Sequence, residues 1–233
     1  MRKILAAAVL ASTLGAQSAW AGYEEGLAAA IRGDYATALR ELRLPAEQGD
    51  APAQYALGVM YLEGRGVRQD NGQALRWFRK SALQGNGKAE YNLGIMYFHG
   101  QGVRRGYAEA ARWFKSAAER GYAEAQYNIG LMYQKGQGVR ENQIEAVKWY
   151  RKGAEQGGAD AQIGLGLMYY RGQGVPRDYV QAYKWAVLAV ARSPAGDSRK
   201  VAVKYQDFIA TRMAPAQIAE AQRLADEWND KHQ

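Results

Sequence analysis

The chain of 233 residues contains no cysteine, so neither disulfide bridges nor thiol-based catalytic or metal sites are available to it. Histidine is almost as scarce, with only His99 and His232. A lone histidine does not make a metal site, and His99 has no serine partner at a suggestive spacing. The Gly-x-Gly segments lack both the preceding strand and the lysine of a phosphate-binding loop. We therefore predict no catalytic residue, no metal and no cofactor.

Only one apolar run is conspicuous, and it lies at the N-terminus. A basic start, Met1-Arg2-Lys3, precedes the apolar run Ile4 to Ala16, and Ala19-Trp20-Ala21 supplies small residues for cleavage before Gly22. The run is shorter than the roughly 20 residues that span a bilayer, which disfavours a membrane anchor. We expect a Sec-type signal peptide over residues 1–21, with cleavage after Ala21 and a periplasmic or secreted protein.

A period of 36 residues dominates the rest of the chain. The motif Ala-Gln-Tyr-Ala-Leu-Gly-Val-Met-Tyr, written from its first copy, returns three more times with its glycine in place, and a tryptophan follows each copy at a fixed distance. The glycines are Gly58, Gly94, Gly130 and Gly166, and the tryptophans are Trp77, Trp113, Trp149 and Trp185. This regularity predicts a repeat protein.

Each repeat has the pattern of two antiparallel helices. In the first, Gln54 and Leu57 follow helical spacing, and Gly58 lets a neighbouring helix approach closely. In the second, residues 74–82 carry one apolar stripe with spacings of three and four. Gly64 to Val67 suit the turn between the helices. The residues expected to cap the second helices are Asp70, Gly106, Asn142 and Asp178.

A single helix pair cannot bury both of its faces, so neighbouring pairs must stack. We predict an all-α fold, an α/α superhelical solenoid of helix-turn-helix repeats. A degenerate N-terminal capping repeat is expected over 22–50, repeats over 51–86, 87–122, 123–158 and 159–194, and C-terminal capping helices over 195–233. Within that last segment we expect one helix near 199–212 and another that starts at Pro215.

These motifs carry a resemblance to a known family. The pattern Ala-x-Ala-Gln-Tyr-x-Leu-Gly-x-Met-Tyr-x-x-Gly-x-Gly-Val, followed by Ala-x-x-Trp-Phe and a closing Glu-Gln-Gly or Glu-Arg-Gly, resembles the Sel1-like repeat family, relatives of the tetratricopeptide repeats. The resemblance implies an adaptor or scaffold for protein complexes, and exported bacterial members are associated with envelope signalling, cell-wall regulation and host contact. Some cysteine-rich exported relatives bind or hydrolyse β-lactams, but this chain departs from them because it lacks cysteine.

By similarity to tetratricopeptide repeats, one stripe of each first helix faces a concave groove. Residues 55 and 57 point about 200° apart at 100° per residue, so the stripe that includes Tyr55 lies opposite the packing stripe. The candidate groove residues are Tyr55, Leu62, Glu63, Tyr91, Phe98, His99, Tyr127, Gln134, Lys135, Tyr170 and Arg171. The recurring tyrosines have a second explanation, which is packing between adjacent first helices. The positions that vary between copies are therefore the stronger candidates for specificity.

A second candidate surface is a basic rim at the loop edge. Its members are Arg68, Arg104, Arg140 and Arg177. Such a rim could attract an anionic lipid headgroup, a glycan or an acidic protein, although solvated surface charge is an alternative explanation. Nucleic acid is not an expected partner outside the cytoplasm, despite the net charge of +8.

The sequence thus predicts an exported, non-catalytic scaffold of the bacterial cell envelope. Its expected partner is a peptide or helix of another envelope or secreted protein, held in the concave groove of a monomer. Contact with the membrane surface is possible but is not expected. The alternative is a cell-wall or β-lactam-related enzyme, or a protein that binds an anionic ligand.

Overall fold

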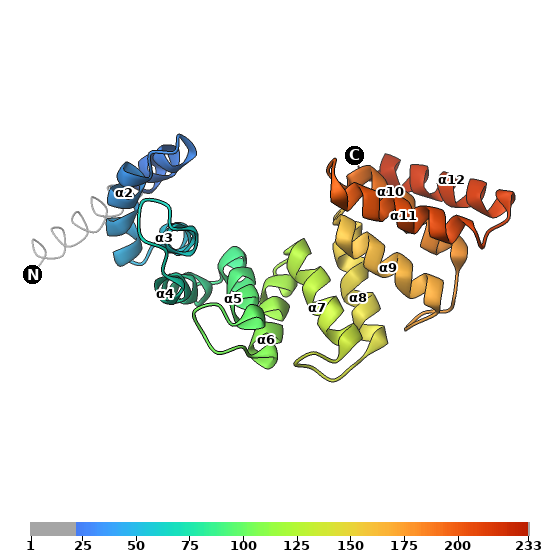
Figure 1. Ribbon diagram of the computed structural model, residues 1–233, viewed down its shortest axis with the longest axis horizontal. Coiled ribbons are helices and arrows are strands. Elements are labelled where there is room, and N and C mark those ends of the chain that lie inside the picture. Colours follow the sequence, from blue (N-terminus) through green and yellow to red (C-terminus); the bar gives the residue numbers. More distant parts are fainter. Residues whose placement is uncertain (1–21, 233) are drawn as a thin grey trace, which may run out of the picture. The chain divides into compact units, whose positions relative to one another are not determined.

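The computed structural model describes residues 22–232, which form helices joined by turns and contain no strand (Figure 1). The predicted signal peptide lies outside these residues. After a helical segment at 22–31, the helices are α2 (Tyr35–Glu47), α3 (Ala51–Glu63), α4 (Asn71–Ala82), α5 (Gly87–His99), α6 (Tyr107–Glu119), α7 (Ala123–Lys135), α8 (Gln143–Glu155), α9 (Ala159–Arg171), α10 (Tyr179–Arg192), α11 (Asp197–Ala210) and α12 (Pro215–Lys231). The predicted all-α fold of helix-turn-helix repeats is confirmed. None of the described helices is both long and apolar enough to cross a membrane.

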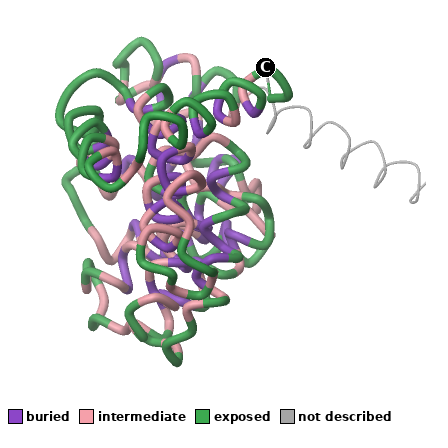
Figure 2. The backbone as a smooth tube through the Cα atoms, turned by 90° about the vertical axis from the view of Figure 1, so that its right-hand side faces the viewer, coloured by how far each residue is buried: buried purple, intermediate pink, exposed green. Residues whose placement is uncertain are grey.

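The chain forms two compact units, which meet in sequence at Gly106 and Tyr107. Inside each unit, the first helix of a repeat packs against the second, as α3 does with α4 and α9 with α10. The second helix then packs against the first helix of the next repeat, as α4 does with α5 and α8 with α9. Buried residues lie where helices face one another, and exposed residues mark the turns and outer surfaces (Figure 2). Each unit is therefore held by the stacking that the apolar periodicity requires.

Local capping explains why the helices begin and end where they do. Asp70, Asn142 and Asp178 are N-caps, as predicted, and each accepts hydrogen bonds from backbone N–H groups of the first turn. The four first helices of the repeats end at glycines in the left-handed conformation. The next glycine of each loop lets the loop approach the backbone of the preceding repeat closely. At Gly66, where φ is 69°, a Cβ atom would lie 2.6 Å from the carbonyl oxygen of Tyr35 in the preceding repeat.

In the first, third and fourth repeats, the glycine at the centre of the first helix makes room for an aromatic ring. A Cβ atom on Gly58 would lie 2.5 Å from Phe78 Cδ1, and one on Gly130 would lie 2.8 Å from Tyr150 Cδ1. The fourth repeat has Ala186 at the position of these rings. There Tyr205 of α11 takes the space, with its hydroxyl oxygen 3.1 Å from the expected Cβ of Gly166. A residue of the C-terminal segment thus replaces a ring that the repeat itself lacks.

Buried glutamines connect consecutive repeats. The Nε2 groups of Gln54, Gln126 and Gln162 donate to backbone carbonyls at the end of the preceding second helix, over 3.0, 3.1 and 3.2 Å. Each of these carbonyls also accepts the N–H of a glycine in the following turn, Gly49, Gly121 or Gly157, so the glutamine adds a second hydrogen bond at the helix end. The glutamine bonds also explain why a polar residue recurs at a position that is almost fully buried.

The C-terminal helices both pack on α10. Tyr205 and Ile209 of α11 form a cluster with Ala182 and Ala186, whereas Trp228 of α12 joins a different cluster that includes Trp185. The helix expected near 199–212 starts two residues earlier, at Asp197, and Pro215 begins α12 as predicted. The two helices cover apolar surface that the fourth repeat would otherwise expose.

Candidate partner-binding surfaces

In the first unit, the predicted groove residue Tyr55 lies in a contact between helices. Its ring centroid is 5.8 Å from that of Phe78 on α4, and Asn92 on α5 lies near its hydroxyl. Burial is the largest influence on this side chain and raises the pKa of the Tyr55 hydroxyl. Tyr91, Leu62 and Phe98 of the same stripe are half-buried. Tyr55 therefore contributes to packing, whatever else it contacts.

In the second unit, Tyr127 and Gln134 have comparable roles. The ring of Tyr127 lies 5.8 Å from that of Tyr150, and burial raises the pKa of the Tyr127 hydroxyl. The hydroxyl of Tyr150 donates to Gln134 Oε1 over 2.8 Å, and Gln134 Nε2 donates to the sulfur of Met168 over 3.3 Å. Gln134 thereby accepts the hydrogen bond of a buried tyrosine hydroxyl, a role that its position in the repeat did not reveal.

Tyr170 of the fourth repeat touches the C-terminal segment. Its ring centroid lies 5.4 Å from that of Tyr179 and 5.1 Å from that of Phe208 on α11. Ile163 and Leu167 of the same stripe pack against the cluster that α10, α11 and α12 form. The stripe of α9 is therefore partly covered by the chain itself.

The last residue of each first helix is exposed. These residues are Glu63, His99, Lys135 and Arg171, and we call them the edge residues. Glu63 pairs with Arg65 over 2.6 Å, and the ring of His99 lies 5.1 Å from that of Phe98. Lys135 and Arg171 make no ion pair within the described part of the chain. The second unit thus presents two unneutralised positive charges at equivalent positions.

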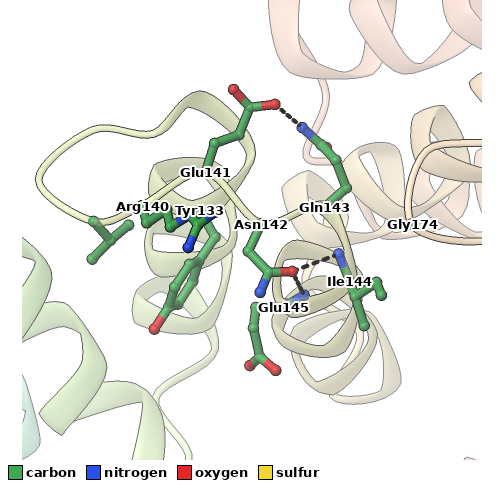
Figure 3. Close-up of a pocket in the computed structure, with 9 residues that line it drawn as sticks. Tyr133, Arg140, Glu141, Asn142, Gln143, Ile144, Glu145 and Gly174 are labelled. Carbon is green, nitrogen blue, oxygen red and sulfur yellow. Dashed lines mark hydrogen bonds between the residues drawn. The ribbon is translucent and has the colours of Figure 1, made fainter.

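The predicted rim arginines are exposed in both units. Arg177 lies over the ring of Tyr179, 5.9 Å from its centroid. Arg68, Arg104 and Arg140 make no ion pair within residues 22–232. Arg68 lines a surface depression in the first unit, and Arg140 lines one in the second (Figure 3).

The two depressions occupy the same place in their repeats. Each has a tyrosine, an arginine, an N-cap residue and an amide in its wall, and the members of the second set follow those of the first by 72 residues. The sets are Tyr61, Arg68, Asp70 and Asn71, and Tyr133, Arg140, Asn142 and Gln143. The arginines were predicted from the sequence, but the tyrosines and amides were not, because every copy of the repeat has a tyrosine at that position.

No cluster of three or more His, Asp or Glu side chains suited to a metal ion occurs among residues 22–232. The described side chains either pack between helices or lie exposed at equivalent positions of the repeats. The exposed side chains that differ between repeats lie at helix ends and in loops.

These features define an α-helical repeat scaffold. Helix pairs stack, aromatic rings pack against glycines in the buried interior, and the helix ends face the solvent. The Sel1 repeat model matches residues 51–86, 87–122, 123–158 and 159–193. The chain belongs to the Sel1 repeat family, which confirms the predicted resemblance. Proteins of this family generally act as scaffolds for protein–protein interactions and are typically non-catalytic.

Two solved structures share both sequence and fold with the chain. One is c5321, described as a protective antigen of uropathogenic Escherichia coli strains with an SLR fold; it is 34% identical over 96% of this chain, with a TM-score of 0.83. The chain spans 48% of the length of that relative. The other, a Sel1 repeat protein from Oxalobacter formigenes, is 30% identical over 89% of this chain and 84% of its own, with a TM-score of 0.74.

A more distant structure shares the fold alone. PilF of Pseudomonas aeruginosa is 17% identical over 93% of this chain and 99% of its own, with a TM-score of 0.61. No curated protein matches the chain.

Proposed function

We propose that the chain is exported and acts as a non-catalytic adaptor of the bacterial cell envelope, which binds a segment of another protein along the ends of its first helices. The observation that carries this proposal is the set of edge residues. Glu63 and His99 in the first unit, and Lys135 and Arg171 in the second, are exposed and chemically different at one repeat position.

The contrast with the other repeated positions supports this assignment. The central glycine is the same in all four repeats, and the position of Tyr55 is a tyrosine in three of them; Gly58 and Tyr55 both lie in contacts between helices. The edge residues carry no such packing role, so their chemistry can vary without loss of the fold. Variation at exposed, equivalent positions gives each repeat a different group with which to contact a partner.

The charges of the edge indicate what the partner carries. Lys135 and Arg171 stand at the C-termini of α7 and α9, where the helix dipole favours positive charge. Both side chains are free of ion pairs in the described chain, so an acidic side chain of a partner can approach them without breaking a bond. Such pairs set register and association rate more than affinity. Half-buried Leu62 and Phe98 supply apolar area beside the edge of the first unit.

The proposal of export depends on residues 1–21. Their basic start, apolar run and small residues before Gly22 fit a cleaved signal. The N-terminal sequence of the native protein tests this point. We expect a mature chain that begins at Gly22 and fractionates with the periplasm or the medium, and an intact N-terminus in the cytoplasm would contradict it.

The edge is tested by site-specific photo-crosslinking in the native cells. A photoreactive phenylalanine analogue is placed at His99 or Arg171, and matched controls carry it at Arg76 on α4 or Arg212 after α11. All four residues are exposed. We expect one defined protein adduct from the edge positions and none from the controls. An adduct pattern that is the same at all four positions would remove the edge assignment.

A further inference from the structure

The outer face of α4, in the first unit, carries three cations that no acidic side chain neutralises. Arg76, Arg79 and Lys80 lie on the side of the helix opposite its buried residues, and all three are exposed. None of them forms an ion pair within residues 22–232. The helix itself contains no aspartate or glutamate. The face therefore presents three positive charges along roughly 6 Å of helix axis.

The carboxylates that neutralise the equivalent cations of other repeats are missing from α4. On α6, both cations pair with glutamates of the same helix, and on α8 one cation does. The pairs are Glu109–Arg112 at 2.9 Å, Glu119–Lys115 at 3.8 Å and Glu145–Lys148 at 2.5 Å. At the positions of these glutamates α4 has Gln73 and Leu83. The remaining second helix, α10, has a single cation at these positions, Lys184.

Two large apolar side chains are exposed on the outer sides of the second helices of the first unit. Leu83, the C-cap of α4, is 76% exposed, and Leu44 of α2 is 55% exposed. The period places Leu44 at the position of Lys80, on the outer side of its own helix. The charged residues of α2 balance one another; they are Arg40, Glu41, Arg43 and Glu47. Helix α2 therefore adds an exposed leucine to the surface but no net charge.

The arrangement of these side chains favours a lipid surface over a protein as the partner. A protein interface has a contiguous apolar centre inside a polar rim. Here the two leucines stand on different helices, and Arg79 and Lys80 precede Leu83 by one helical turn. Anionic headgroups move to pair with separate cations, and single apolar side chains enter the boundary between headgroups and acyl chains. Such a surface needs no matching apolar pocket.

We propose that the outer faces of α2 and α4 rest on an anionic phospholipid membrane. Arg76, Arg79 and Lys80 bind the lipid phosphates, and Leu44 and Leu83 insert beside the headgroups. Three net charges and two leucines give weak, reversible attachment rather than a permanent anchor. This surface departs from the sequence-based expectation that membrane contact does not occur. It belongs to the second helices, so the edge residues of the first helices remain available to a protein partner.

Co-sedimentation with lipid vesicles tests the proposal. The sample is the chain without residues 1–21, because their apolar run would itself bind lipid. The vesicles contain phosphatidylcholine with about 30% phosphatidylglycerol, in about 150 mM salt, and vesicles of phosphatidylcholine alone are the comparison. R76A/K80A should weaken binding to the anionic vesicles at least tenfold, since each cation near the surface contributes about fivefold. L44S/L83S, which leaves the charge unchanged, should weaken it about fivefold.

The second unit supplies matched controls. K148A/K152A removes the same charge from α8, where Lys152 lies over a tryptophan ring at 4.5 Å, as Lys80 does on α4 at 4.4 Å. I144S removes an apolar side chain that is 58% exposed. Each control should change vesicle binding by no more than about twofold, which is the scale of screened surface charge. Unchanged melting of all variants confirms that the fold is intact.

Insertion of Leu83 is measured separately. Because the chain has no cysteine, L83C can carry a single polarity-sensitive fluorophore, and E119C carries it at the equivalent position of the second repeat. Anionic vesicles should shift the emission of labelled L83C to shorter wavelength and leave that of E119C unchanged.

Three results would overturn the proposal: no binding to anionic vesicles, an equal loss in K148A/K152A, or vesicle binding without an emission shift at L83C. Pentaglutamate is the further comparison ligand. If it binds and the vesicles do not, and R76A/K80A abolishes its binding, the outer face of α4 belongs to an acidic protein partner instead.

Discussion

The substitution Gly58→Ala tests the contact that holds the two helices of a repeat together. The new Cβ would lie 2.5 and 2.6 Å from Cδ1 and Cε1 of Phe78, about 1 Å closer than ordinary carbon contacts. The Phe78 ring is fully buried, and the Tyr55 ring, at a centroid distance of 5.8 Å, restricts its movement. Either the ring or helix α3 must shift.

The expected size follows from two opposing terms. Overpacking in a core costs about 1–3 kcal/mol, and replacing glycine by alanine inside a helix returns about 1 kcal/mol. We therefore expect a net loss of about 1 kcal/mol in the free energy of unfolding. Gly72→Ala on α4 is the control, since a Cβ there would meet only Asp70 Oδ1, at 3.2 Å. It should be neutral or slightly stabilising.

Urea unfolding followed by circular dichroism measures both variants, and amide exchange in α3 and α4 detects local opening, because repeat proteins do not always unfold in one step. The double variant Gly58→Ala with Phe78→Leu should lose about 1 kcal/mol less than the sum of the single losses. If Gly58→Ala is as stable as the unmodified chain or more so, the ring moves freely and the close-packing argument is wrong.

Three further predictions concern buried hydroxyls, alkaline pH and a helix cap. Tyr150→Phe should cost about 1 kcal/mol because it removes the bond to Gln134. Tyr205→Phe should be neutral or stabilising, because the Tyr205 hydroxyl is buried and has no hydrogen-bond partner within residues 22–232. Equal melting temperatures for the two variants would contradict this difference. Burial raises the pKa of the Tyr150 and Tyr205 hydroxyls above the usual value of 10.0. The protonated hydroxyls therefore favour the folded state fully below about pH 10, and this stability falls as pH rises beyond it. A melting temperature that does not change from about pH 9 to 11 would refute the expected loss of stability with rising pH. Asp50→Ala should cost about 1 kcal/mol in urea unfolding through loss of its 2.7 Å bond to the N–H of Ala53, and Asp50→Asn should recover most of it.

Much of the repeat architecture was predictable because its causes are local. The 36-residue period, the glycine at the end of each first helix and the N-caps Asp70 and Asn142 each act within a few residues, so sequence spacing alone indicates helix, turn and cap. The rim arginines and the last residues of the first helices could be singled out for the same reason, since the period places equivalent residues at equivalent positions.

The sequence did not reveal which polar groups are already occupied. Tyr61 and Tyr97 are the same residue in the same motif, yet within residues 22–232 only Tyr97 receives a hydrogen bond from an arginine of the preceding repeat. Gln134 stood out as a variable position and proved to bind the hydroxyl of Tyr150. Both outcomes depend on contacts between residues 16 or more positions apart.

The C-terminal segment shows where sequence and tertiary structure divide. The sequence by itself determined that the pattern breaks after Ala186 and that Pro215 starts a helix. Only the tertiary structure decided that Tyr205 of α11 fills the space beside Gly166 and that Trp228 of α12 packs beside Trp185 of α10. The reason is physical: helices form from short-range hydrogen bonds and spacing, whereas the ring that fills a cavity is selected by the shape left by all of its neighbours.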